Sequence, residues 1–190
     1  MRPLVLNEPL PGVLFLASFG LWVVWELALQ VRTKQGEDRT RRAEFYGTAL
    51  GLTLAFSAAG VHDRLPGPGW VAVGVGLVLL WAGWLYRAWA VRTLGRFFRV
   101  TVVVDEDQRV VDTGPYRMLR HPSYTGMLVT LVGVGTALDS WLSIAAAFLP
   151  GLIAILRRIG EEEGVLLREL GEPYRDYARR TRHRLLPGVW

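Results

Sequence analysis

The amino-acid sequence predicts an all-α integral membrane protein with about five transmembrane helices. Apolar residues make up 51% of its 190 residues. They fall into blocks of about twenty, the length of helix that crosses a hydrocarbon core of roughly 30 Å. Basic residues cluster between these blocks and bring the formal net charge to +5, almost wholly through arginine. This pattern is typical of loops that face anionic lipid headgroups, and it argues against a nucleic-acid surface.

Three segments in the first half are predicted to span the membrane, at residues 12–31, 45–61 and 70–91. Glu26 interrupts the first of them and is expected to lie at the membrane interface or to face another helix. The third segment ends in a cluster of tryptophan and tyrosine residues that is typical of an interfacial aromatic belt. Arg87 is expected to snorkel to the same membrane surface.

The second half is predicted to contain a tight helical hairpin, with apolar arms at residues 127–138 and 141–156. The first arm barely crosses the bilayer, because the segment 125–138 would rise only about 21 Å as a helix. Residues 161–170 are expected to continue as an amphipathic helix beyond the membrane, with Gly171 as its C-cap.

The basic segments predict how the chain lies in the membrane. The loop at residues 32–42, the segment at residues 92–120 and the C-terminal tail all carry clustered arginines. Five spans then place the N-terminus outside and these three regions in the cytoplasm. Within the second region, residues 93–113 are compatible with a small β-hairpin or with an extended segment.

The segment from Gly114 to Gly126, GPYRMLRHPSYTG, is dense in chemically useful side chains. Its two prolines bias the residues before them away from helix. Aromatic, cationic and imidazole groups are therefore held on a constrained backbone where a membrane segment begins. Such a place can bind a polar ligand at the edge of the lipid.

Two clusters of functional side chains flank the predicted hairpin, and a chain that crosses and returns would bring them together. The clusters are Tyr116, Arg120, His121 and Tyr124 before it, and Arg158, Glu162 and Glu163 after it. Arg158 and Glu162 are four residues apart and share a helix face. On this spacing alone, an ordinary surface ion pair is the simpler interpretation.

Other site chemistries have little support in the sequence. The chain has no cysteine, which excludes disulfides, thiolate metal sites and cysteine nucleophiles. Its three histidines show no HExxH or similar spacing, so we expect no metal site. There is no phosphate-binding Walker or Rossmann pattern, and Ser123 lacks the strand–turn–helix setting of a hydrolase nucleophile. Gly133-Val134-Gly135 indicates helix packing.

The second half of the chain carries a series of short motifs: GPY at 114–116, RHPSY at 120–124, Gly126, Arg158-Ile159, Glu162-Glu163, Leu166, LGxxYxxY at 170–177 and RLLP at 184–187. In this order, the motifs resemble those of the isoprenylcysteine carboxyl methyltransferase family. The resemblance covers residues 94–187, whereas the first ninety residues resemble the family only in being transmembrane.

The resemblance implies an integral membrane methyltransferase that moves a methyl group from S-adenosylmethionine (SAM) to a lipid-like acceptor, with a carboxylate as in isoprenylcysteine carboxyl O-methylation. Residues 1–92 would form N-terminal transmembrane helices. Residues 93–190 would form the catalytic region, in which the hairpin and a cytoplasmic C-terminal cap build the cofactor site. Arg158 would address the acceptor carboxylate. The implied cofactor contacts are Gln108, Val110, Val111, Tyr116, His121, Pro122, Ser123, Tyr124 and Glu162.

The chemistry of SAM agrees with these assignments. Glu162 can pair with its ammonium, and His121 can donate a hydrogen bond to its polar groups. Tyr116 and Tyr124 offer ring faces to the adenine or the sulfonium. Arg158 suits bidentate binding of a carboxylate. An ionised acceptor needs no general base, and its reaction with a sulfonium cancels two charges, which a dry site at the lipid boundary favours.

The acceptor and the activity each leave alternatives open. The chain is expected to be a short form of the family, and its arginine-rich composition suggests a bacterial cytoplasmic membrane, where a prenylated cysteine is not an expected substrate. An amine or hydroxyl acceptor would need a base, for which residues 161–163 are the only candidates. A membrane NADPH reductase of the sterol or enal type shares RHPxY but differs after the hairpin. A non-catalytic membrane scaffold with the same fold is the third hypothesis.

Overall fold

The computed structural model describes residues 3–32, 39–59, 61, 63–98 and 109–188. These residues form helices joined by short segments and contain no β-strand, which confirms the predicted all-α class. The helices are α1 (Leu4–Asn7), α2 (Pro9–Arg32), α3 (Arg39–Ala58), α4 (Gly69–Leu94), η1 (Gly95–Phe97), η2 (Gly114–Arg117), α5 (Pro122–Ala137), α6 (Trp141–Leu170) and α7 (Glu172–Arg180).

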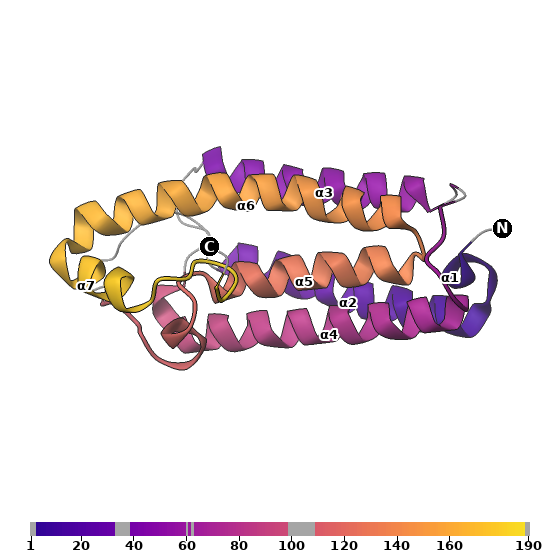
Figure 1. The fold of residues 1–190 in the computed structure, drawn as a ribbon, viewed down its shortest axis with the longest axis horizontal. Helices are drawn as coiled ribbons and strands as arrows, with labels where there is room; N and C mark the ends of the chain where they lie inside the picture. Colours follow the sequence, from indigo (N-terminus) through magenta and orange to yellow (C-terminus); the bar gives the residue numbers. More distant parts are fainter. Residues whose placement is uncertain (1–2, 33–38, 60, 62, 99–108, 189–190) are drawn as a thin grey trace.

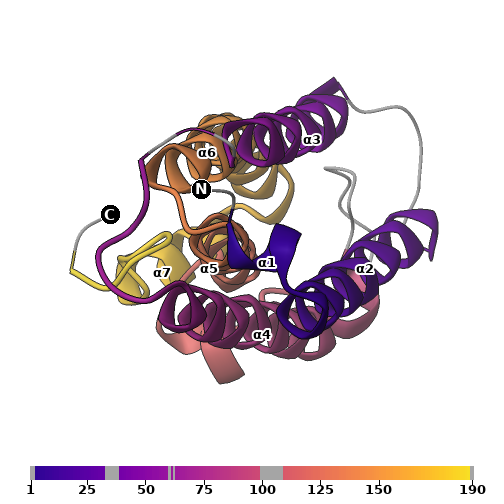
Figure 2. The same ribbon diagram turned by 90° about the vertical axis from the view of Figure 1, so that its right-hand side faces the viewer.

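The long helices α2 to α6 lie side by side along the long axis of the molecule (Figure 1). Helix α5 is the central one. Helix α5 packs between α4 and α6, and almost all of the residues of α5 are buried. Helix α3 lies against α6 (Figure 2). The second half of α6 extends past the other helices, and α7 turns back toward the bundle at that end (Figure 1).

Three of the described helical segments are long and apolar enough to cross a membrane: α2, the combined segment Gly69–Phe97 and α6. The apolar part of α3 (Phe45–Ala58) is shorter, and the 16 residues of α5 rise only about 24 Å. The outer faces of the long helices expose large apolar side chains such as Leu10 and Trp70. Exposed apolar surface on this scale suits contact with lipid, and the chain is an integral membrane protein.

Helices α5 and α6 form the predicted hairpin, and polar side chains fix its turn. Ser140 caps α6, because its hydroxyl accepts a hydrogen bond from the Ser143 amide at 3.0 Å. The loop before α4 fastens the same turn. Asp63 accepts from the Ser140 hydroxyl at 2.7 Å, and Arg64 Nε donates to Asp139 at 2.6 Å.

Helix α6 continues beyond its membrane arm, as predicted. It runs without a break from Trp141 to Leu170, so the predicted membrane arm and the predicted amphipathic helix are one element. The change to polar residues at Arg157 marks the edge of the apolar segment, but polarity alone does not end a helix. The helix ends where it was expected to end, before Gly171, whose φ of 58° suits glycine.

Glycines allow α4 and α5 to approach closely. A Cβ atom added at Gly83 would lie 2.5 Å from the backbone nitrogen of Thr130, and one added at Gly133 would lie 2.4 Å from that of Leu80. No side chain fits at such distances, so the interface depends on small residues, as is common between membrane helices. The predicted packing role of Gly133 is therefore confirmed.

Replacing Gly133 by alanine is expected to lower the free energy of unfolding by about 1–3 kcal/mol, because the added methyl group meets the backbone of α4. The matched control is Gly74→Ala in α4, where an added Cβ meets nothing within 4 Å and helix propensity improves. Thermal unfolding of both variants in one detergent measures the difference. Equal midpoints would contradict the packing argument.

Candidate active site

The RHPSY element at residues 120–124 joins the one-turn helix η2 to the central helix α5. Gly114 has a φ of 55° and opens η2, and Pro122 occupies the first turn of α5, where its missing N–H is not needed. His121 and Tyr124 lie one helical turn apart, and their rings stack with centroids separated by 5.8 Å. The element thus presents an imidazole and a phenol together.

The C-terminal segment after α7 pairs with this element through its backbone. The His121 amide donates to the Arg184 carbonyl at 2.9 Å, and Thr125 Oγ1 donates to the Leu185 carbonyl at 2.7 Å. The RLLP motif at residues 184–187 therefore lies against the RHPSY element, although the two are far apart in the sequence.

Helix α6 brings its charged residues to the same place. The Tyr124 hydroxyl accepts a hydrogen bond from Arg158 Nε at 2.5 Å and donates one to Glu162 Oε2 at 3.0 Å. His121 Nδ1 lies 4.0 Å from the same Glu162 oxygen. The predicted meeting of the two clusters is confirmed. The surface ion-pair interpretation is wrong for Arg158, which is only 2% exposed.

Glu163 is a buried carboxylate that holds two other segments against α6. Its oxygens lie 2.8 Å from Arg120 Nη1, 3.1 Å from His121 Nε2 and 2.8 Å from Arg184 Nη2. The bond to Glu163 also raises the pKa of the Arg184 guanidinium above its ordinary value. This role was not predicted, because two adjacent glutamates look alike until the helix packs one of them inward.

Tyr116 lies buried beneath α7, where its carbonyl accepts a hydrogen bond from the Tyr177 hydroxyl at 2.9 Å. Burial, followed by the negative charge of Glu162, raises the pKa of the Tyr116 hydroxyl, so this group stays protonated.

The other predicted contacts precede η2. Val110 and Val111 are half-buried in a segment without regular structure, which Asp112 ties to Arg180 of α7 at 3.0 Å. Gln108 lies outside the described residues, as do residues 99–107 of the segment for which a β-hairpin was considered.

Arg87 does not snorkel to the membrane surface, and that prediction was wrong. The residue is 4% exposed and binds both carboxylate oxygens of Glu26, at 2.6 and 3.0 Å. It also donates through Nη1 to the Ser123 hydroxyl at 2.6 Å. A carboxylate within one span needs a cation from a neighbouring span, which draws the arginine inward. Glu26 faces another helix, as one of its two predicted placements had it.

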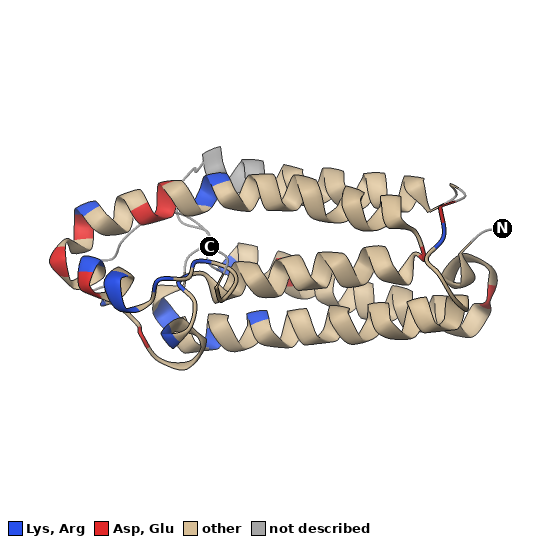
Figure 3. Cartoon of the chain, viewed as in Figure 1, with Lys and Arg blue, Asp and Glu red and all other residues tan. Residues whose placement is uncertain are grey.

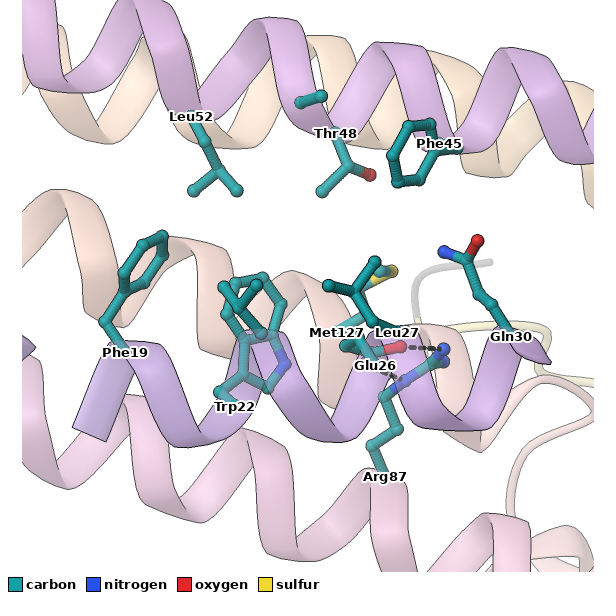
Figure 4. A pocket seen from close by; sticks show the side chains of 12 residues that line it. Phe19, Trp22, Glu26, Leu27, Gln30, Phe45, Thr48, Leu52, Arg87 and Met127 are labelled. Carbon is teal, nitrogen blue, oxygen red and sulfur yellow. Dashed lines mark hydrogen bonds and ion pairs between the residues drawn. The ribbon is translucent and has the colours of Figure 1, made fainter. Parts of the chain in front are cut away.

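The Glu26–Arg87 pair forms part of the wall of an apolar cavity between α2 and α3 (Figure 4). The cavity has a volume of about 380 Å³, and its wall includes Phe19, Trp22, Phe45, Leu52 and Met127. Met127 lies one turn after Ser123 on α5. The cavity therefore borders the helix that carries the RHPSY element.

Charged residues gather at the end of the bundle formed by α7 and the second half of α6, whereas the long middle is almost free of charge (Figure 3). The RHPSY element and its partners lie at this boundary between an apolar bundle and a charged end.

A sequence profile of the isoprenylcysteine carboxyl methyltransferase family matches residues 75–168, from α4 through the acidic residues of α6. This segment of the chain belongs to the family. It is 34% identical over 122 residues to the "Probable protein-S-isoprenylcysteine O-methyltransferase" of Oryza sativa subsp. indica, and the match spans 63% of each protein. It is 33% identical over 113 residues to the "Nickel-cobalt-cadmium resistance protein NccN" of Alcaligenes xylosoxydans xylosoxydans, spanning 59% of this chain and 52% of that protein.

The fold resembles the solved structure of a eukaryotic intramembrane Ras methyltransferase, an isoprenylcysteine carboxyl methyltransferase. The TM-score is 0.69 over 98% of this chain and 70% of that one, at 22% sequence identity. The family profile begins at residue 75 rather than 94, so the expectation that the first ninety residues resemble the family only in being transmembrane is wrong. Most of α4 belongs to the family segment, in keeping with its close packing on α5.

Replacing Glu163 by glutamine is expected to loosen the C-terminal segment, because the neutral side chain loses its charged bond to Arg184. Hydrogen exchange at the amides of Arg120 and His121, which donate to this segment, should rise about tenfold or more. The control Glu172→Gln changes an exposed glutamate of α7 and should leave these amides unchanged. Equal exchange in the two variants would contradict the role of Glu163.

Proposed function

We propose that this protein is a membrane methyltransferase that moves a methyl group from SAM to the carboxylate of a lipid-like acceptor, as in isoprenylcysteine carboxyl O-methylation. The observation that carries the proposal is the contact of the Tyr124 hydroxyl with both Arg158 and Glu162. A cation suited to a carboxylate and an anion suited to an ammonium thus flank one phenol oxygen at the edge of the membrane.

Glu162 is the carboxylate that best suits the ammonium of SAM. Glu163 is buried and already balanced by Arg120 and Arg184, whereas the Glu162 side chain is 30% exposed and remains accessible to a cationic ligand. The stacked rings of His121 and Tyr124 lie beside it and offer a surface to the adenine or the sulfonium.

When bound, SAM supplies a methyl group on a positively charged sulfur. The further cofactor contacts that we propose are Gln108, Val110, Val111, Tyr116, Pro122 and Ser123.

Arg158 is proposed to hold the acceptor carboxylate. A guanidinium carries five N–H donors in a planar fork, so its donation to Tyr124 is compatible with bidentate binding of a second group. The side chain is buried, and Tyr124, to which it donates, packs in an apolar cluster with Ile155 and Ile159. These residues exclude water, and a charged hydrogen bond is stronger in such surroundings. No general base is required, because a carboxylate is already ionised.

The apolar cavity between α2 and α3 is proposed to hold the lipid tail of the acceptor. The charged pair in its wall is neutral as a unit, because both oxygens of Glu26 bind Arg87. Each buried CH₂ group would favour binding by about 0.8 kcal/mol. Met127 connects the cavity to the site, since it also packs in the apolar cluster that contains Tyr124.

We further propose that α2 to α6 form five spans in a bacterial cytoplasmic membrane, with the N-terminus outside and the site facing the cytoplasm. The arginines gathered at the α7 end support this orientation by the positive-inside rule (Figure 3). In this orientation, the segment from α7 to residue 188 would form the cytoplasmic cap. Membership of the methyltransferase family argues against the NADPH reductase.

Replacing Glu162 by glutamine should weaken SAM binding at least tenfold, because the loss of one charged hydrogen bond costs about 1.5–3 kcal/mol. Isothermal titration calorimetry of the purified protein in detergent measures this change. The control Glu169→Gln, exposed on the same helix, should bind as the wild type does. Binding of NADPH in place of SAM would favour the reductase, and binding of neither would favour a non-catalytic scaffold.

Replacing Arg158 by lysine should preserve SAM affinity and reduce turnover at least tenfold, because an ammonium cannot bind a carboxylate bidentately. Transfer of radiolabel from SAM is followed into a farnesylcysteine analogue and, separately, into a total bacterial membrane lipid extract. The extract identifies the acceptor without assuming it, which matters because one relative is named as a metal-resistance protein. The control is Arg157→Lys at the exposed neighbouring position. Unchanged turnover in Arg158→Lys would remove the assigned role.

A further inference from the structure

Glu26 and Arg87 form a buried ion pair between α2 and α4, to which we have assigned no contact with SAM or with the acceptor carboxylate. The residues are 8% and 4% exposed, and two hydrogen bonds of 2.6 and 3.0 Å join them. Removing two charges from water is costly, and an apolar pair of similar volume often stabilises a fold as well. Stability alone is therefore a weak reason for this pair.

The same guanidinium reaches the start of α5. Its Nη1 donates to the hydroxyl and to the carbonyl oxygen of Ser123, at 2.6 and 3.1 Å. The backbones of α4 and α5 also approach closely here, since a Cβ added at Gly126 would lie 2.7 Å from the backbone nitrogen of Arg87. Arg87 thus lies against the start of α5 with both its guanidinium group and its backbone.

This first turn carries the rings of the candidate site. Ser123 lies between His121 and Tyr124, and the Tyr124 amide donates to the His121 carbonyl at 3.1 Å within the same turn. A shift of the Ser123 peptide would move both rings relative to Glu162 on α6.

We propose that Glu26 and Arg87 are positioning residues for the cofactor site. Glu26 fixes the guanidinium of Arg87, and Arg87 fixes the first turn of α5, which sets the direction of the His121 and Tyr124 rings. The cofactor part of this inference rests on the proposed function. The pair acts on this turn through the hydrogen bonds that Arg87 donates to Ser123.

A set of variants separates positioning from stability. Arg87→Met alone leaves Glu26 buried without its cation and should destabilise the protein. The double variant Glu26→Leu with Arg87→Met removes both charges and should recover most of the lost thermal stability. Ser123 still lacks its donor, so SAM affinity should stay at least tenfold below that of the wild type. Arg87→Lys keeps a positive charge beside Glu26 but lacks the planar guanidinium. Its SAM affinity should lie between that of the double variant and that of the wild type.

Hydrogen exchange gives a readout that does not depend on SAM. In the double variant, the amides of Tyr124 and Thr125, which donate to the His121 carbonyl, should exchange about tenfold faster than in the wild type. The matched control is Ser18→Ala, which removes the 3.2 Å hydrogen bond from Trp81 between the same two helices and should leave these amides and SAM affinity unchanged.

The inference is overturned if the double variant exchanges these amides at the wild-type rate, or if SAM affinity recovers together with thermal stability. A wild-type protein that binds no SAM would instead refute the proposed function. In that case, the exchange rates of the double variant and of Ser18→Ala alone decide whether the pair positions the first turn.

Discussion

The site depends on one buried carboxylate that three segments share. Glu163 projects from α6 and binds Arg120 and His121 of the RHPSY element together with Arg184 of the C-terminal segment. Each of these groups is cationic or can become so, and a carboxylate accepts such bonds strongly. These bonds add to those that Tyr124 makes with Arg158 and Glu162, and together they hold α6 against the start of α5.

The division of charge follows from this arrangement. Glu163 binds Arg120 and Arg184, which leaves Glu162 as the more exposed of the two carboxylates. On the other side of α5, Glu26 and Arg87 neutralise each other within the apolar bundle. A polar site and an apolar cavity can therefore border the same helix, which suits a reaction between a charged donor and a lipid-like acceptor at the membrane surface.

The meeting of the two clusters could be predicted, because a hairpin that crosses and returns must bring its ends to one face. The role of Tyr124 as the link between Arg158 and Glu162 could not, since spacing on α6 pointed to a direct pair between those two. The continuation of α6 beyond its apolar arm, by contrast, was predicted. A polar stretch marks the end of the apolar surface, and the helix itself continues until a glycine stops it.

The membrane class, the hairpin and the family were readable from the chain, because they depend on the length of apolar blocks and on short motifs in a set order. The hydrogen-bond partners of the buried charged residues could not be predicted from the chain. Arg87 could have reached the lipid surface, and either of two adjacent glutamates could have turned inward. Helix packing settled both, since a buried charge must find its counterion within hydrogen-bond distance, and the nearest one comes from a distant part of the sequence.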